Sequence, residues 1–191
     1  MKAYFSGSLY QKNQFYKYYE RIVDLLKKQG IEVFEDTLKT DFDDSLDMKD
    51  EDRVRNYRNI VKWIDKCDFA VIEGSFPSTL HIGHEITLAL DKSRPVIVLY
   101  KSGAEPMVFK GLLDEKIIWA EYKDDNLEKV LTKALAEAKK NMDVRFNFFV
   151  SPKILAYLDW VAKNRMIPRA VFLRDLIEKE MRKDKDYGSQ S

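Results

Sequence analysis

A short segment in the middle of the chain concentrates the side chains best suited to chemistry. Segment 73–85 carries two carboxylates, Glu73 and Glu85, and both histidines of the chain, His81 and His84. Carboxylates act as nucleophiles or as proton donors and acceptors, and imidazole titrates near neutral pH. The segment therefore predicts nucleophilic or acid–base chemistry, with Glu85, His84 and Glu73 as candidate catalytic residues.

Each of these side chains also has a structural explanation. The helix dipole stabilises an acid in the first turns of a helix by ~0.3–1 kcal/mol, so Glu85 need not be functional. His81, His84 and Glu85 have the spacing His-x-x-His-Glu, which lacks the His-Glu-x-x-His order of zinc enzymes and an obvious third ligand. We therefore predict no metal here, and both the catalytic and the structural interpretation stay open.

Short apolar runs alternate with amphipathic stretches over residues 1–140. The expected strands are 3–6, 31–34, 69–72, 95–100 and 117–119, and the expected helices are about 15–29, one ending near 66, 83–92, 106–114 and 127–140. Strand 95–100 is nearly all apolar, as a strand covered on both faces should be. The alternation predicts an α/β domain at 1–140, with a doubly wound five-stranded parallel sheet of Rossmann-like or flavodoxin-like order.

Ligands of a doubly wound sheet bind at the carboxyl ends of the strands, near the point where strand order reverses. For this sheet the point lies between the first and third strands, which end in the turns Gly7-Ser8 and Gly74-Ser75. Glycine in such turns lets the backbone approach a ligand closely. Neither GxGxxG nor GxxxxGK(S/T) occurs, so we expect no dinucleotide or other cofactor and no P-loop.

Three stretches form a pattern along residues 1–85: Ala3-Tyr4-Phe5-Ser6-Gly7-Ser8, Tyr19-Glu20-Arg21-Ile22-Val23 and the stretch from Pro77 to Glu85. Together they resemble the nucleoside 2-deoxyribosyltransferases, and most nearly their 2'-deoxynucleoside 5'-monophosphate N-glycosidase branch. The resemblance spans about residues 2–138, and its motifs are short. It implies an enzyme that cleaves or transfers the N-glycosidic bond of a nucleoside or nucleotide.

The resemblance also implies roles for residues along this edge of the sheet. Glu85 would attack C1' of the sugar and release the base, and water or a second base would resolve the covalent glycosyl-enzyme. Tyr4 would lie near the base, and Thr79 would replace a family serine near the 5' end. The full set of predicted substrate-binding residues is Tyr4, Gly7, Ser8, Asn59, Gly74, Ser75, Thr79, His81 and Gly83.

Several positions depart from the family pattern. Ile60, with Asn59 beside it, stands where the family has an aspartate that helps to position and protonate the substrate, and an amide cannot donate a proton as an acid does. His81 and His84 replace a motif glycine and tyrosine, and Pro106 replaces a serine that a neighbouring subunit contributes to the phosphate. Either histidine is a candidate replacement for the missing acid, and the sequence leaves phosphate recognition and turnover open.

Residues 141–184 follow a different pattern. Apolar and polar side chains alternate over 144–150, and helix signals begin at Ser151-Pro152. About residues 145–182 resemble the ribbon-helix-helix family of DNA-binding dimers. We therefore predict a ribbon-helix-helix-like β-α-α segment at 141–184 for dimerisation or DNA binding, followed by a disordered tail at 185–191.

One strand and two helices of this size cannot close a core alone, so the resemblance implies a homodimer or higher homo-oligomer with paired strands. The paired ribbon would present Arg145, Asn147 and Phe149 to a DNA major groove. Arg169 lies near the helix end that would contact a phosphate. Two alternatives stay open, a dimerisation clamp without DNA binding and the capture of another protein.

The composition limits the class of protein. The chain has 191 residues, 45% hydrophobic and 34% charged, with a net charge of +1, so nucleic-acid binding must come from a local patch. Cys67 is the single cysteine and cannot form an internal disulfide, and no apolar run approaches the ~20 residues of a membrane helix. We expect a cytoplasmic protein that does not bind membranes.

Two functional hypotheses follow. In the first, the chain is a hydrolase or transferase in which Glu85 cleaves an N-glycosidic bond, and the C-terminal segment holds the homo-oligomer together. In the alternative, the α/β domain senses a nucleotide without turnover, and the C-terminal ribbon makes the chain a DNA-binding transcriptional regulator.

Overall fold

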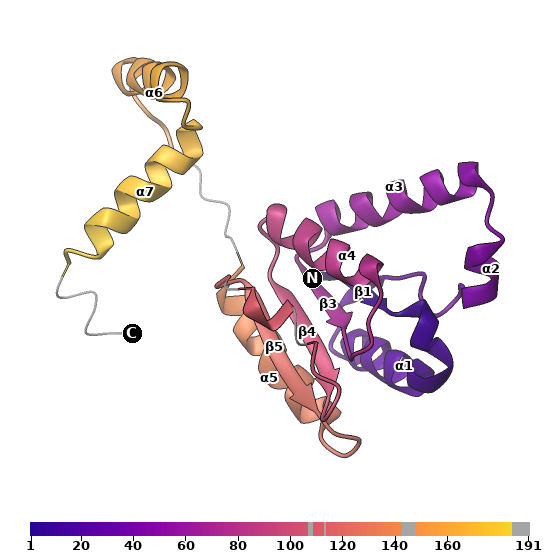
Figure 1. The fold of residues 1–191 in the computed structure, drawn as a ribbon. Coiled ribbons are helices and arrows are strands. Elements are labelled where there is room, and N and C mark those ends of the chain that lie inside the picture. Colours follow the sequence, from indigo (N-terminus) through magenta and orange to yellow (C-terminus); the bar gives the residue numbers. More distant parts are fainter. Residues whose placement is uncertain (107–108, 113, 143–147, 185–191) are drawn as a thin grey trace. The chain divides into compact units, whose positions relative to one another are not determined.

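The computed structural model describes residues 1–106, 109–112, 114–142 and 148–184. The chain divides into two compact units, Met1–Val144 and Arg145–Ser191. In the first unit, a parallel sheet with strand order β2-β1-β3-β4-β5 lies between two layers of helices (Figure 1). This confirms the predicted α/β class and the doubly wound five-stranded parallel sheet.

The elements of the first unit follow the expected alternation. The strands are β1 Lys2–Gly7, β2 Glu32–Phe34, β3 Phe69–Glu73, β4 Val96–Lys101 and β5 Ile117–Tyr122. The helices are α1 Lys12–Lys28, α2 Phe42–Leu46, α3 Asp50–Lys66, α4 Leu80–Asp91 and α5 Leu127–Lys140, with 3-10 turns η1 Leu9–Gln11 and η2 Phe109–Gly111. Helices α1 and α5 cover one face of the sheet, and α3 and α4 cover the other (Figure 1).

Strand β3 shows how side chains divide between the two faces. Phe69 and Val71 pack into the core beneath α1 and α5, and Ala70 and Ile72 pack into the core beneath α3 and α4. Because side chains alternate along a strand, Glu73 points toward the α1 and α5 layer. This direction matters for the site described below.

Two segments differ from the expected elements. Helix α2 is not among the expected helices, and Asp43 and Asp44 in its first turn interact favourably with the helix dipole. Of the expected helix at 106–114, the described residues form only the turn η2. The Pro106 carbonyl accepts hydrogen bonds from the Phe109 and Lys110 amides at the start of this turn.

The second unit contains two helices, α6 Pro152–Arg165 and α7 Arg169–Met181. Ser151 caps α6, because its Oγ accepts a hydrogen bond from the Ile154 amide at 3.4 Å. The expected strand at 144–150 lies mostly outside the described residues. Its described part, Phe148 to Val150, has no regular secondary structure.

Candidate active site

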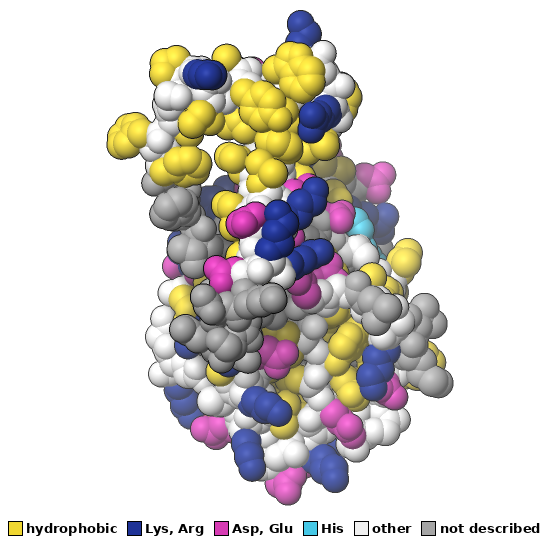
Figure 2. All heavy atoms as spheres, turned by 90° about the vertical axis from the view of Figure 1, so that its left-hand side faces the viewer, with side chains coloured by type: hydrophobic (Ala, Val, Ile, Leu, Met, Phe, Trp, Pro, Cys, Tyr) yellow, Lys and Arg dark blue, Asp and Glu magenta, His cyan; other side chains and the backbone are white. Residues whose placement is uncertain are grey.

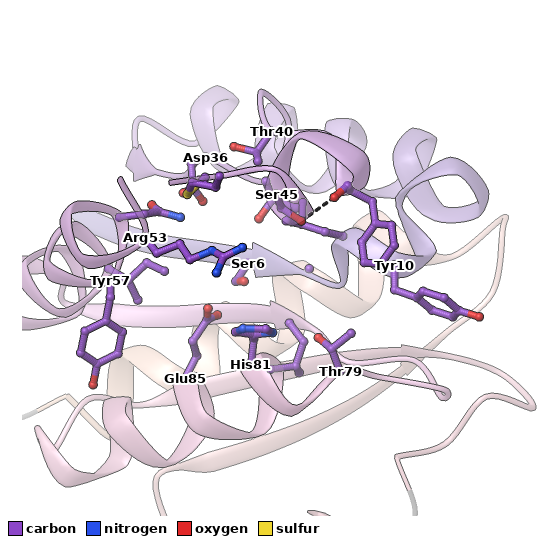
Figure 3. A pocket seen from close by; sticks show the side chains of 18 of the residues that line it. Ser6, Tyr10, Asp36, Thr40, Ser45, Arg53, Tyr57, Thr79, His81 and Glu85 are labelled. Carbon is purple, nitrogen blue, oxygen red and sulfur yellow. Dashed lines mark hydrogen bonds between the residues drawn. The ribbon is translucent and has the colours of Figure 1, made fainter. Parts of the chain in front are cut away.

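A cavity of about 480 Å³ opens at the carboxyl end of β1. Its walls come from the end of β1, the segment between β2 and α3, one face of α3 and the N-terminal half of α4. The side chains that reach toward its centre are Glu85, His81 and Thr79 from below, Asp36 and Thr40 from above, and Arg53 from the side (Figure 3). Of the residues predicted from sequence, Gly7, Thr79, His81 and Glu85 line this cavity.

Glu85 is the most deeply buried ionisable side chain in the cavity wall. It lies on α4 with 5% of its surface exposed, and burial raises the pKa of its carboxyl to about 7. Hydrogen bonds from the hydroxyls of Ser6 and Tyr4 oppose this rise, and the charge of Asp36 adds to it. Its Oε2 atom is buried and has no hydrogen-bond partner among the described residues. Glu85 therefore borders the cavity with a carboxyl that is largely shielded from water.

Tyr4 supports Glu85 from beneath the cavity rather than lining it. The ring is fully buried in the core under α3 and α4. Burial, and then the nearby charge of Glu85, raise the pKa of the Tyr4 hydroxyl, so it stays protonated at neutral pH. A protonated hydroxyl donates a hydrogen bond to the carboxylate and holds it in one orientation.

The wall opposite Glu85 contains polar residues that the sequence reasoning did not single out. Asp36, the second residue after β2, is partly buried, and burial raises the pKa of its carboxyl. Asn56 on α3 forms a side-chain hydrogen bond with Asp36. Arg53, one turn earlier, supplies the one Lys or Arg side chain among the described lining residues, and its Nη2 donates to the Leu46 carbonyl at 2.8 Å. Its position just beyond the carboxyl end of a strand is the feature of the sequence that could have identified Asp36 as a site residue.

A buried lysine fixes the segment that forms this wall. Lys12, at the start of α1, has 7% of its surface exposed. Its Nζ donates to the carbonyls of Leu38 at 3.0 Å and Thr40 at 2.8 Å, and to Asp41 at 2.9 Å. A buried ammonium must be paired to be tolerated, so these bonds connect α1 to the segment after β2.

The two histidines have different surroundings. Both are exposed, and only His81 lines the cavity. The His84 ring stacks on Tyr57, with ring centroids 5.7 Å apart, and its Nε2 lies 3.2 Å from the Tyr57 hydroxyl. Because Tyr57 lines the cavity, His84 touches the site through that tyrosine rather than directly.

Glu73 does not reach the cavity, and the expectation that it shares a site with Glu85 needs correction. Its side chain lies on the opposite face of the sheet, fully buried. The Tyr122 hydroxyl donates to its Oε1 at 3.0 Å, and the Ser75 hydroxyl donates to the same oxygen. Burial raises the pKa of Glu73 to about 7. Ser75 is therefore part of this buried cluster rather than of the cavity wall.

Four further predicted residues lie outside the cavity wall. Asn59 is exposed on α3 and does not line the cavity, whereas Asn56 does. The carbonyl of Ser8 accepts a hydrogen bond from the Tyr19 hydroxyl at 3.1 Å. Gly74 and Gly83 allow close packing, since a Cβ atom would lie 3.0 Å from Val98 at the first and would overlap the ring of Phe109 at the second.

The residues predicted to contact DNA belong to the second unit. Arg145 and Asn147 lie outside the described residues. Phe149 is fully exposed, and Arg169 forms an ion pair with Asp159 on α6. Within the described residues no group of three or more His, Cys, Asp or Glu side chains is placed to hold a metal ion. In the same part of the chain, no helix is long and apolar enough to cross a bilayer.

Comparisons with known proteins find a relative by sequence and similar folds among solved structures. No protein-family model matches the chain. A relative from Syntrophotalea carbinolica, named "Putative 2'-deoxynucleoside 5'-phosphate N-hydrolase 1", is 32% identical over 139 residues, which are 72% of this chain and 96% of the relative. The structure of a Clostridium botulinum CMP N-glycosidase matches with a TM-score of 0.50 and 14% identity, over 71% of this chain and 99% of its own. A de novo designed Rossmann 2x3 protein matches with a TM-score of 0.41 and 14% identity, over 78% and 98%.

The buried carboxyl of Glu73 generates a prediction about stability and pH. The pKa of Glu73 is about 7 in the folded protein, compared with an ordinary value of 4.5 that applies to the unfolded chain. Between these two pH values folding takes up a proton, so the free energy of unfolding falls as pH rises from about 4.5 to 7. The shift corresponds to about 3 kcal/mol. In Glu73→Gln we expect the fall between pH 5 and 8 to shrink by about this amount, measured by urea unfolding.

Glu121→Gln, which removes an exposed carboxyl from β5, is the control and should retain the pH dependence of the parent. Parallel curves for Glu73→Gln and the parent would contradict a buried, protonated Glu73.

Proposed function

The chain belongs to the family of the 2'-deoxynucleoside 5'-phosphate N-hydrolases, and we propose that its first unit cleaves the N-glycosidic bond of a nucleoside 5'-phosphate with Glu85 as the nucleophile. The observation that carries the proposal is the buried Glu85 carboxyl at the wall of a cavity of about 480 Å³. Small-molecule sites are commonly ~300–1,000 Å³, so a mononucleotide is a suitable occupant.

The surroundings of Glu85 fit a nucleophile. Ionised Glu85 attacks C1' of the sugar, the bond from C1' to the base breaks, and a glycosyl ester forms on the carboxyl. Hydrogen bonds from Tyr4 and Ser6 orient the carboxylate, and its low solvent exposure leaves little water to displace. Water then attacks C1' and releases the sugar phosphate, or a second base accepts the sugar.

The start of α4 offers a place for the 5'-phosphate. Thr79 is the N-cap of α4, its side chain forms no capping hydrogen bond, and the first turn carries no acidic residue. A helix N-terminus with free amides attracts an anion. Thr79 and His81 line the cavity at this end, and Gly7 also contributes to the wall.

Glu85→Gln tests the nucleophile. We expect the parent to release free base from one or more members of a panel of ribo- and deoxyribonucleosides and their 5'-monophosphates, and the variant to be slower on the order of 10³-fold or more. The parent rate should rise with pH through about 7, because only the ionised Glu85 attacks. Chromatography of the released base measures both.

Glu73→Gln is the matched control, because Glu73 is a buried glutamate with the same raised pKa on the other face of the sheet. It should retain base release. No release from any substrate by the parent would refute the enzyme hypothesis for common nucleosides, and full activity in Glu85→Gln would refute the nucleophile.

The proposed role of the second unit is to join two copies of the chain. Leu158 and Val161 are its buried hydrophobic side chains among the described residues. Large apolar side chains remain exposed on both helices and gather over this unit (Figure 2): Ile154, Leu155, Tyr157, Trp160, Val171, Leu176, Ile177 and Met181. Two helices of this length bury too little surface to be stable alone, and an apolar surface of this kind favours a partner. The ribbon-helix-helix resemblance supplies a mode in which a second copy is that partner.

Ile177→Asp tests this role in the full chain. Ile177 is 59% exposed, so a charge there is harmless in a monomer and disruptive in an apolar interface. We expect light scattering after gel filtration to give a dimer or larger for the parent and one 22.5 kDa chain for the variant. Glu178→Gln, the neighbouring exposed position, should leave the mass unchanged. A monomeric parent would contradict the proposal.

The alternative function is that of a DNA-binding regulator without turnover. Its support is the charge of the C-terminal segment, where ten Lys and Arg residues stand against seven Asp and Glu residues from Met142 onward. On this alternative, we expect the parent to retard duplex DNA from a random-sequence pool in a salt-dependent way, and Arg145→Ala to bind more weakly. DNA retardation together with no base release would favour the regulator, and no retardation at low salt would exclude it.

A further inference from the structure

Cleavage of an N-glycosidic bond needs a proton for the base that leaves. The electron pair of the broken bond moves onto the base, and protonation of the base stabilises this charge in the transition state. Ile60, the α3 residue at the family's aspartate position, lines the cavity but cannot supply a proton. A proton donor in this cavity must therefore be sought among its other side chains.

Asp36 lies where a substrate would meet it and Glu85 together. It lines the same cavity from the opposite wall, above Glu85 in the view of Figure 3. The negative charge of Asp36 raises the pKa of Glu85, so the two carboxyls interact and take up and release protons as a coupled pair. A nucleotide bound with its C1' against Glu85 would therefore lie between the carboxyls of Glu85 and Asp36.

The surroundings of Asp36 favour a carboxyl that exchanges a proton. Burial raises its pKa, and the hydrogen bond from Asn56 opposes this rise and orients the carboxyl. The charged and titratable groups around it are Glu35 and Lys39 on its own segment, Tyr4 on β1, Arg53 on α3 and Glu85 on α4. Lys39 pairs with Glu35 at 3.4 Å, and Arg53 pairs with Asp50 at 3.4 Å, so both cations have other partners.

The other proton donors of the cavity are less suitable. His81 is exposed at the start of α4, the end assigned above to the phosphate. The Tyr57 hydroxyl is engaged with His84. Tyr10 is 64% exposed and its ring packs edge-on against Phe42. Asp36 is the carboxyl that faces Glu85 across the described cavity.

We infer that Asp36 donates the proton to the leaving base and then accepts a proton from the attacking water. This inference rests on the proposed N-glycosidase function. In the first step the bond from Glu85 to C1' forms, the bond from C1' to the base breaks, and the Asp36 proton moves to the base. In the second step the Asp36 carboxylate takes a proton from water, the hydroxide binds C1', and Glu85 leaves as a carboxylate. Both groups return to their starting states, so no further reactant is needed.

Asp36→Asn separates this role from a structural one, because it keeps the size of the side chain and its hydrogen bonding to Asn56. With the natural nucleotide we expect base release to slow by ~10²-fold or more. The 4-nitrophenyl glycoside of the same sugar phosphate has a leaving group that needs no proton. With this substrate we expect the variant to release a burst of one nitrophenolate per site, at a rate less than about tenfold below that of the parent. Turnover after the burst should be slow, since the variant has also lost the group that activates water.

The burst should coincide with a glycosyl adduct on Glu85, detected by mass spectrometry of the intact variant. A second measurement uses the natural nucleotide alone. The parent rate should fall again at high pH as the Asp36–Glu85 pair loses its last proton, and this fall should be absent in Asp36→Asn, where no second carboxyl is present. Asp43→Asn, which removes an exposed acid on α2 outside the cavity wall, should behave as the parent.

Equal losses with both leaving groups, without a burst, would overturn the inference and leave Asp36 a binding or structural residue. An unchanged rate with the natural nucleotide would overturn it as well. Activity in Glu85→Gln, by contrast, would show that the proposed function itself has failed, because the inference about Asp36 assumes that nucleophile.

Discussion

The exclusion of water from the Glu85 carboxyl is the constraint on which the site depends. A carboxyl on a helix that packs against the carboxyl end of a parallel sheet loses most of its hydration, and its ionised form becomes less stable. The protein offsets part of this cost with the hydroxyls of Tyr4 and Ser6, which come from β1. The sheet register matters for the same reason, because β1 must end beside β3 and under α4 for these hydroxyls to reach Glu85.

A raised pKa does not by itself identify a reactive group. Glu73 and Glu85 both titrate near 7, both are buried, and both have one oxygen without a hydrogen-bond partner among the described residues. They differ in the face of the sheet on which they lie. Glu73 ends β3 among the side chains of α1 and α5, whereas Glu85 borders an open cavity. The accessible space beside a carboxyl, rather than its acidity, separates a candidate nucleophile from a core residue.

The sequence predicts the parts of this protein that depend on the spacing of apolar residues and on their burial. The apolar strands and the amphipathic helices predict the doubly wound sheet, and the spacing after β3 places Glu85 in the first turns of α4. Asp36 lies in a stretch with no periodic pattern, so its direction depends on how Lys12 holds the following segment.

Helix α3 shows why a correct element can still yield a wrong residue. Arg53, Asn56, Tyr57 and Ile60 line the cavity, and their spacing of three and four residues places them on one face of the helix. Asn59 lies one residue before Ile60 and is turned away from that face into solvent. Since every described lining residue falls between Ser6 and Glu85, the cavity is built within the first unit. The proposed chemistry in that cavity and the proposed association through α6 and α7 therefore rest on different residues, and the failure of either proposal leaves the other standing.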